Sequence, residues 1–162
     1  MIVVADAGPL IFLAKIRRLG LVHQLLGDDI RIPRPVRAEV LTPGADPAEI
    51  AALEAFLADC LVEPVPRPRS FASAMSSADN AALTLAVRRK ADILLCDERV
   101  TRMMAETEGI RPLGTLGILL RARRSGLVEP AETRRLVDLL VATHGFRISV
   151  EVYQAVLATI ES

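Results

Sequence analysis

Near its start the chain reads Ile2-Val3-Val4-Ala5-Asp6-Ala7-Gly8-Pro9-Leu10, an apolar run that ends abruptly in one acid and then in a Gly-Pro turn. The run from Ile2 to Ala5 is too short for a helix and too apolar for an exposed strand, so it predicts a central strand of a parallel sheet. Asp6 then lies at the carboxyl end of this strand, the edge at which open α/β sheets bind ligands. Capping of the helix that begins near Pro9 explains Asp6 equally well.

The composition indicates one globular domain. Of the 162 residues, 51% are apolar and 25% are charged, a balance that excludes disordered and fibrous proteins. The 20 basic side chains equal the 20 acidic ones in number, so a nucleic acid would have to bind a local patch. No apolar stretch is long enough to span a bilayer, and no basic leader precedes the first apolar run. We therefore expect a cytoplasmic protein with no membrane partner.

The two cysteines, Cys60 and Cys96, lack the spacing of a metal-binding motif. Both stand among apolar residues. We expect them to be small buried side chains in a reducing compartment, without a catalytic role.

Strands alternate with helices along most of the chain. Short apolar runs predict further strands at residues 30–33, 61–65, 92–96 and 110–113. The strand at 61–65 should lie at an edge of the sheet, because Pro64 cannot donate a ladder hydrogen bond. Helical spacing and capping residues predict helices between the strands, at residues 10–16, 19–26, 36–41, 47–59, 78–87 and 98–105.

The last part of the chain, from Thr115, is predicted to be wholly helical, with helices at residues 116–124, 130–143 and 150–160. The whole pattern predicts a three-layer α/β/α sandwich with a central, mainly parallel sheet. We expect residues 1–162 to form a single domain, in which residues 115–162 are a helical extension packed on the sandwich.

A second strand also ends in an acid, since Ile93-Leu94-Leu95-Cys96 leads directly to Asp97. Two further acids stand at the starts of helices or close after strands. Glu39 lies in the helix after the second strand, and Asp79 lies in the first turn of the helix capped by Ser76 and Ser77.

Each of these acids also has a purely structural explanation. Glu39 could pair with Arg34 or Arg37 on its own helix, and Asp79 suits the dipole at a helix start. With right-handed crossovers, however, the strand ends and helix starts face one crevice. We therefore expect one acid cluster there, consisting of Asp6, Glu39, Asp79 and Asp97.

Converging carboxylates repel one another, so without a counter-ion they would destabilise the fold or take up protons. A divalent cation resolves this conflict. Oxygen ligands favour Mg²⁺ or Mn²⁺, whereas zinc would need His or Cys near these acids. Such a site suits hydrolysis of a phosphodiester by a metal-activated water.

Two other α/β classes that begin with a strand ending in Asp are disfavoured. A phosphatase of the haloacid-dehalogenase type needs a second acid two residues after the first, and Gly8 stands there. A phosphoacceptor receiver needs paired acids and a lysine on a later strand, which this chain lacks.

Six blocks spread over nearly the full length are typical of one protein family. They are VVADAGPLIFLAKI, IPRPVRAEV, ADNAALTLA, ILLCDERVTR, PLGTLGILLRARRSGL and GFRISVEVY. On these blocks the chain resembles the PIN-domain family, in the branch recorded as a domain of unknown function and linked to toxin–antitoxin modules. The resemblance implies a Mg²⁺- or Mn²⁺-dependent endoribonuclease that cleaves RNA, is often restrained by a small antitoxin, and uses as metal ligands Asp6, Glu39, Asp79 and Asp97.

The chain departs from the pattern of this branch at two positions. Ala7 stands where many relatives have Ser or Thr, and Ala78-Asp79 stands where the branch usually has Gly-Glu. Both departures bear on metal affinity. They motivate an alternative, a catalytically degenerate PIN-like module that binds nucleic acid or protein.

Further residues are expected near the crevice, namely Asp92, Glu98, Arg99, Arg102 and Thr115. Arg99 and Arg102 could hold RNA phosphate, or they could pair with Glu98 and Glu106. We also expect a homodimer, because the apolar helices between Leu10 and Leu26 exceed what a small core needs.

Overall fold

Five short strands form the sheet in the computed structural model, which describes residues 1–162. They are β1 (Val3–Ala5), β2 (Ile30–Pro33), β3 (Leu61–Glu63), β4 (Ile93–Leu95) and β5 (Arg111–Leu113). All neighbours pair in parallel, in the order β3-β2-β1-β4-β5. β1 is therefore central and β3 lies at an edge, as the sequence predicts.

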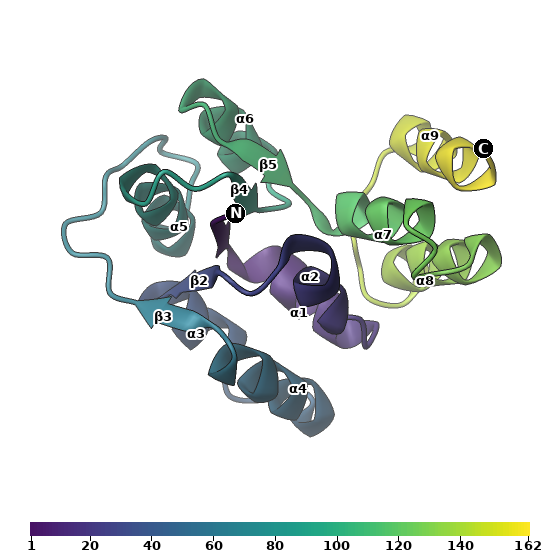
Figure 1. Ribbon diagram of the computed structural model, residues 1–162, viewed down its shortest axis with the longest axis horizontal. Helices are drawn as coiled ribbons and strands as arrows, with labels where there is room; N and C mark the ends of the chain where they lie inside the picture. The colour runs from purple at the N-terminus through teal and green to yellow at the C-terminus, as the bar shows by residue number, and fades with distance from the viewer.

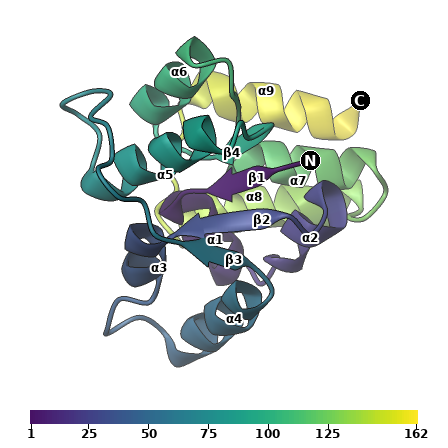
Figure 2. The same cartoon turned by 60° about the vertical axis from the view of Figure 1, so that its left-hand side comes forward.

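The helices surround this sheet on both sides. They are α1 (Ala7–Lys15), α2 (Gly20–Leu26), α3 (Arg34–Val40), α4 (Pro47–Ala58), α5 (Ser77–Arg88), α6 (Arg99–Thr107), α7 (Thr115–Arg124), α8 (Pro130–Ala142) and α9 (Val150–Glu161). Figures 1 and 2 show α5 and α6 on one side of the sheet and α1, α2 and α7 on the other. The predicted α/β fold with a parallel sheet is confirmed. None of the helices is both long and apolar enough to cross a membrane.

The first helix begins earlier than expected, at Ala7 rather than at residue 10. Asp6 is its N-cap, since the Asp6 carboxylate accepts a hydrogen bond of 2.8 Å from the Ala7 N–H. The capping interpretation of Asp6 is thus correct. It does not exclude a chemical role, because one carboxylate oxygen is enough for the cap.

The central strands and the first two helices supply much of the hydrophobic core. Val3, Val4 and Ala5 of β1 are fully buried, and Leu94 and Leu95 of β4 are equally inaccessible. The apolar residues of α1 and α2 are mostly buried as well. The apolar side chains of α1 and α2, which motivated the expectation of a homodimer, are therefore mostly buried within the chain itself. The homodimer stays a prediction.

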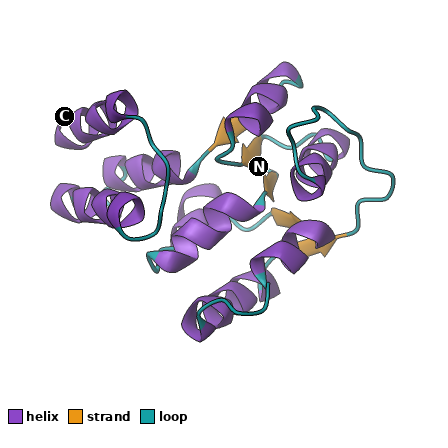
Figure 3. Cartoon of the chain, turned by 180° about the vertical axis from the view of Figure 1, so that it is seen from behind, coloured by secondary structure: helices purple, strands orange, loops and turns teal.

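The last three helices pack on one another at one end of the molecule, as Figure 3 shows from behind. Arg123 of α7 donates hydrogen bonds to the carbonyls of Ile160 and Ser162, at 2.8 and 3.0 Å. Phe146, just before α9, meets Phe12 of α1 edge to face, with ring centroids 4.9 Å apart. The extension is thus joined to the sandwich beside the carboxyl end of the sheet.

Candidate active site

All four members of the acid cluster line one cavity of about 420 Å³ at the carboxyl edge of the sheet. β1 and β4 are neighbours with Ala5 opposite Leu95, so the acids that follow these strands, Asp6 and Asp97, emerge side by side. Helix α3 contributes Glu39 and α5 contributes Asp79. The structure therefore brings together the residues that the sequence singled out, in what we call the acid cavity.

Asp6 is the most strongly perturbed member of the acid cluster. Its side chain is buried, with 4% of the residue exposed. Burial above all raises the pKa of Asp6 from its ordinary 3.8 to about 8, and the neighbouring Asp79 and Glu39 carboxyls add to the rise. The hydrogen bond from the Ala7 N–H opposes this rise without cancelling it. A carboxylate at this position thus lacks a compensating positive charge.

Asp97 is held in place by the start of α7. Its Oδ1 accepts a hydrogen bond of 2.7 Å from the Thr115 N–H, and its Oδ2 accepts one of 2.8 Å from the Thr115 hydroxyl. Burial raises the pKa of Asp97, while the two bonds from Thr115 and the charge of Arg102 lower it. Thr115, expected near the crevice, therefore orients the carboxylate.

Two glycines leave room for this carboxylate. A Cβ on Gly114 would stand 2.8 Å from Asp97 Oδ1, and a Cβ on Gly8 would stand 3.3 Å from Asp97 Oδ2. The backbone of Gly114 is extended, with φ −97°. Glycine is therefore needed at this position because there is no room for a side chain, and not because of the backbone conformation.

Asp79 is fixed by a reciprocal capping box at the start of α5. The Ser76 hydroxyl accepts from the Asp79 N–H, and the Asp79 carboxylate accepts from the Ser76 N–H, both at 3.1 Å. The capping explanation of Asp79 is correct, and the cap also directs the side chain toward Asp6 in the acid cavity. Asp79 therefore combines a structural role with a place in the cluster.

Glu39 lines the acid cavity and is exposed to solvent. Partial burial and the nearby Asp79 charge raise the pKa of Glu39. It forms no ion pair, so the structural alternative in which Glu39 pairs with Arg34 or Arg37 is wrong. Glu39 is left free to face the other acids.

A residue that the sequence did not single out, Thr101, also lines the acid cavity. Thr101 is fully buried, yet its hydroxyl has no hydrogen-bond partner within the protein. A buried polar atom without a partner costs stability unless water or a ligand completes it. Nothing in the sequence marks Thr101, because a threonine in the first turn of a helix is ordinary.

The oxygen donors of the acid cavity suit a hard divalent cation. The cavity offers carboxylates and the Thr101 hydroxyl but no His or Cys ligand, which fits Mg²⁺ or Mn²⁺ rather than zinc. As the side chains stand, no three His, Cys, Asp or Glu residues converge closely enough to hold an ion. The residues fit a cation in chemistry, and binding one would require the carboxylates to rotate toward a common point.

The arginines near the crevice form none of the ion pairs that the sequence allowed. Arg102 donates a hydrogen bond of 3.1 Å to the Cys96 carbonyl, and neither Arg102 nor Arg99 pairs with Glu98 or Glu106. The pairing alternative is therefore wrong.

Asp92 was expected near the crevice, and this is also wrong. Its carboxylate accepts a hydrogen bond of 2.7 Å from the Ile2 N–H. Asp92 precedes β4 whereas Asp97 follows it, so the two acids lie at opposite ends of the strand, and only Asp97 is at the carboxyl end where the acid cavity lies.

The cysteines are free and take no part in the cluster. Cys96 is fully buried and Cys60 is half-buried. Burial raises the pKa of both thiols to about 12, which keeps them protonated. Neither thiol is therefore poised to act as a thiolate nucleophile at neutral pH.

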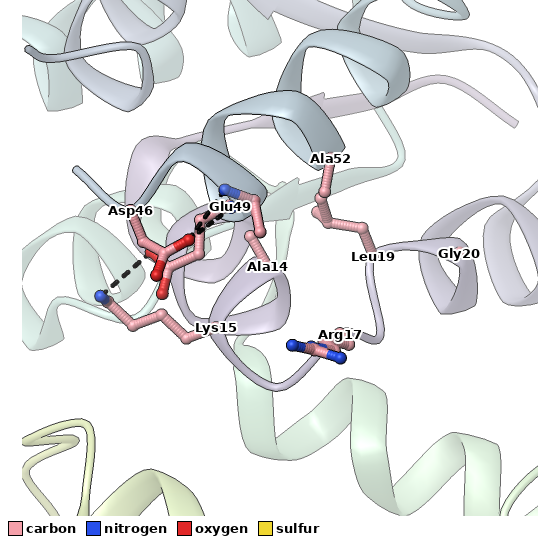
Figure 4. A pocket seen from close by; sticks show the side chains of 9 residues that line it. Ala14, Lys15, Arg17, Leu19, Gly20, Asp46, Glu49 and Ala52 are labelled. Carbon is pink, nitrogen blue, oxygen red and sulfur yellow. Dashed lines mark hydrogen bonds and ion pairs between the residues drawn. The ribbon is translucent and has the colours of Figure 1, made fainter.

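A separate hollow of about 390 Å³ lies between the end of α1 and the start of α4 (Figure 4). The two acids that line this hollow, Asp46 and Glu49, already have partners within the protein. Glu49 pairs with Lys15 at 3.3 Å, and Asp46 caps α4 by accepting from the Ala48 N–H at 2.8 Å. This hollow therefore lacks carboxylates without an ion-pair or capping partner, such as Glu39 in the acid cavity.

Asp6→Asn should stabilise the metal-free protein at alkaline pH. Folding raises the pKa of Asp6 to about 8, so the neutral acid is favoured in the folded state. The stability contributed by the neutral form is lost as the pH rises from about 4 through about 8. Asn keeps an oxygen acceptor for the Ala7 N–H and never ionises. We expect the variant to exceed the wild type by about 1 to 3 kcal/mol at alkaline pH, and by little at acidic pH.

Urea unfolding in EDTA at both ends of this pH range measures the difference. The matched control is Asp59→Asn, because Asp59 is exposed at the end of α4 and far in sequence from the cluster. A wild type as stable as Asp6→Asn at alkaline pH would contradict the prediction.

Comparison with known proteins places the chain in a family. A family model described as a PIN domain matches residues 2–162, nearly the whole chain. Searches of curated proteins and of solved structures gave no match. The family match agrees with the parallel sheet and with the acids at its carboxyl edge. The chain therefore belongs to the PIN-domain family, whose members are in general nucleases.

Proposed function

We propose that the protein is a Mg²⁺- or Mn²⁺-dependent endoribonuclease that hydrolyses RNA phosphodiesters. The observation that carries the proposal is the acid cavity, in which the four acids of the cluster and an unpartnered buried hydroxyl share one space. Glu98, expected near the crevice, lines the same cavity as a fifth acid. Membership of a family of nucleases supports the same chemistry. The catalytic residues and metal ligands proposed are Asp6, Glu39, Asp79 and Asp97.

The protein side chains prepare this site in distinct ways. Thr115 fixes the orientation of Asp97 through both carboxylate oxygens, and Ser76 fixes Asp79. The Thr101 hydroxyl is available to hold a water in the acid cavity. When bound, Mg²⁺ or Mn²⁺ supplies an acidified water and stabilises charge on the phosphate.

Arg102 adds the positive charge that a phosphate substrate needs. Its Nη1 lies against the Cys96 carbonyl, close to the Asp97 carboxylate. A guanidinium there attracts a phosphodiester toward the acids, which would otherwise repel it.

A degenerate module that binds nucleic acid or protein without cleaving it is the second candidate. Two observations favour it: Ala7 offers no hydroxyl beside Asp6, and no three acids converge on one point. The Thr101 hydroxyl weighs against it, because it supplies a donor in the same cavity.

We extend the proposal to a toxin restrained by a small antitoxin. Support comes from the resemblance to the branch of the PIN-domain family linked to toxin–antitoxin modules. The antitoxin, a homodimer and a location in the cytoplasm are parts of this proposal.

The wild type should cleave structured RNA when Mn²⁺ is present and lose this activity in EDTA. Asp6→Asn and Asp97→Asn should each lower the cleavage rate by about 100-fold or more, because each removes one charged ligand. The exposed Asp59→Asn should cleave like the wild type. Denaturing gels of end-labelled RNA measure the rates. Equal rates in the wild type and in both cluster variants would refute the proposal.

Gly114→Ala should lower cleavage without removing any acid. The new methyl would stand 2.8 Å from Asp97 Oδ1 and 3.0 Å from Arg102 Nη1, so the carboxylate must move. We expect a rate loss of about 10-fold or more. Gly20→Ala is the control, because a Cβ there meets nothing within 4 Å. If the two alanine variants cleave equally well, the position of Asp97 does not matter for the chemistry.

A further inference from the structure

A second, larger cavity of about 750 Å³ adjoins the acid cavity and shares Asp97 with it. Its walls come from α6, from the start of α7 and from the segment that leads into α9. We call it the arginine groove. Figure 1 shows α6 and α9 on either side of the start of α7. A substrate chain that lies on Asp97 can therefore continue directly into the groove.

Three arginines line the groove, namely Arg99, Arg102 and Arg147. None of them forms an ion pair, although other arginines of the chain pair with acids. The acids along the groove are Asp97, which belongs to the cluster, and Glu106. The groove therefore holds positive charge that the protein itself leaves unneutralised, in a chain with no net charge.

Apolar side chains form the rest of the groove. Val152 of α9 is 48% exposed and Met103 of α6 is 54% exposed, and both line the groove together with Phe146. The edge-to-face contact with Phe12 anchors Phe146. Exposed apolar side chains beside unpaired arginines offer one surface for bases and another for phosphates.

We propose that the arginine groove binds the nucleotides of single-stranded RNA next to the phosphate that lies at the acid cavity. Arg99 and Arg147 hold the backbone phosphates, and the bases pack on Phe146 and Val152. Unpaired bases are required, because the bases of a duplex face one another and cannot reach this surface. The inference rests on the proposed function for its position but names a separate binding surface.

Charge decides between RNA and a polypeptide as the occupant. Each unpaired arginine can neutralise one phosphate and release a counter-ion, a gain that repeats along a nucleic acid. The continuity of the groove with Asp97 places such a strand in line with the reactive edge.

Fluorescence anisotropy of a labelled single-stranded RNA of about 12 nucleotides tests the proposal. Metal-free protein in EDTA is used, so that no cleavage occurs. We expect Arg147→Gln and Arg99→Gln each to weaken binding by about fivefold or more, and to lower the slope of log affinity against log salt by about 0.7. Val152→Asp should weaken binding as well. Arg124→Gln is the matched control, because Arg124 is an exposed arginine at the far end of α7.

Photo-crosslinking gives a second readout that needs no variant. RNA containing 4-thiouridine should crosslink to the tryptic peptide 148–162, which follows Arg147 and contains no further Lys or Arg. Thermal melting verifies that each variant used in the anisotropy measurement is folded.

Unchanged RNA affinity in Arg147→Gln, Arg99→Gln and Val152→Asp would overturn the inference and leave the groove to a polypeptide partner. A crosslink confined to peptides outside the groove would overturn it too. The two proposals fail separately. Wild-type cleavage with unaffected groove variants refutes only the groove, whereas groove-dependent binding without any cleavage refutes only the nuclease.

Discussion

Asp6 is buried beside Asp79 and Glu39, and the other features of the site follow from this burial. The fold places a carboxyl group at the centre of the sheet edge, surrounds it with other acids and provides no ion pair for it. Such an arrangement costs stability in the absence of a cation. Proteins accept this kind of cost at functional sites, where the same groups bind and react.

The side chains that hold the acids in place also hold the fold together. Asp6 begins α1, Asp79 begins α5, and Asp97 accepts hydrogen bonds from the first residue of α7. The parallel pairing of β1 with β4 then sets the acids side by side. Structural and chemical interpretations of these acids are therefore compatible, since each side chain uses part of its hydrogen-bonding capacity for a cap and keeps the rest for the cavity.

The sequence carried enough information for the sheet, for most element ends and for the placement of the four acids around one cavity, because strand ends and capping residues are local signals. It could not reveal Thr101, whose interest lies in a missing partner, or the groove around Phe146 and Arg147, which requires α6, α7 and α9 to meet in space. The sequence interpretation also misplaced Asp92. This acid stands just before β4 and therefore at the amino end of the strand, whereas the acid cavity lies at the carboxyl end.

Calorimetric titration with Mn²⁺ measures directly whether the acid cluster forms a cation site. We expect saturable binding by the wild type, unchanged binding by Asp59→Asn, and affinity lower by about 10-fold or more in Asp97→Asn. The absence of binding to the wild type, or equal binding by the wild type and Asp97→Asn, would contradict the proposed cation site.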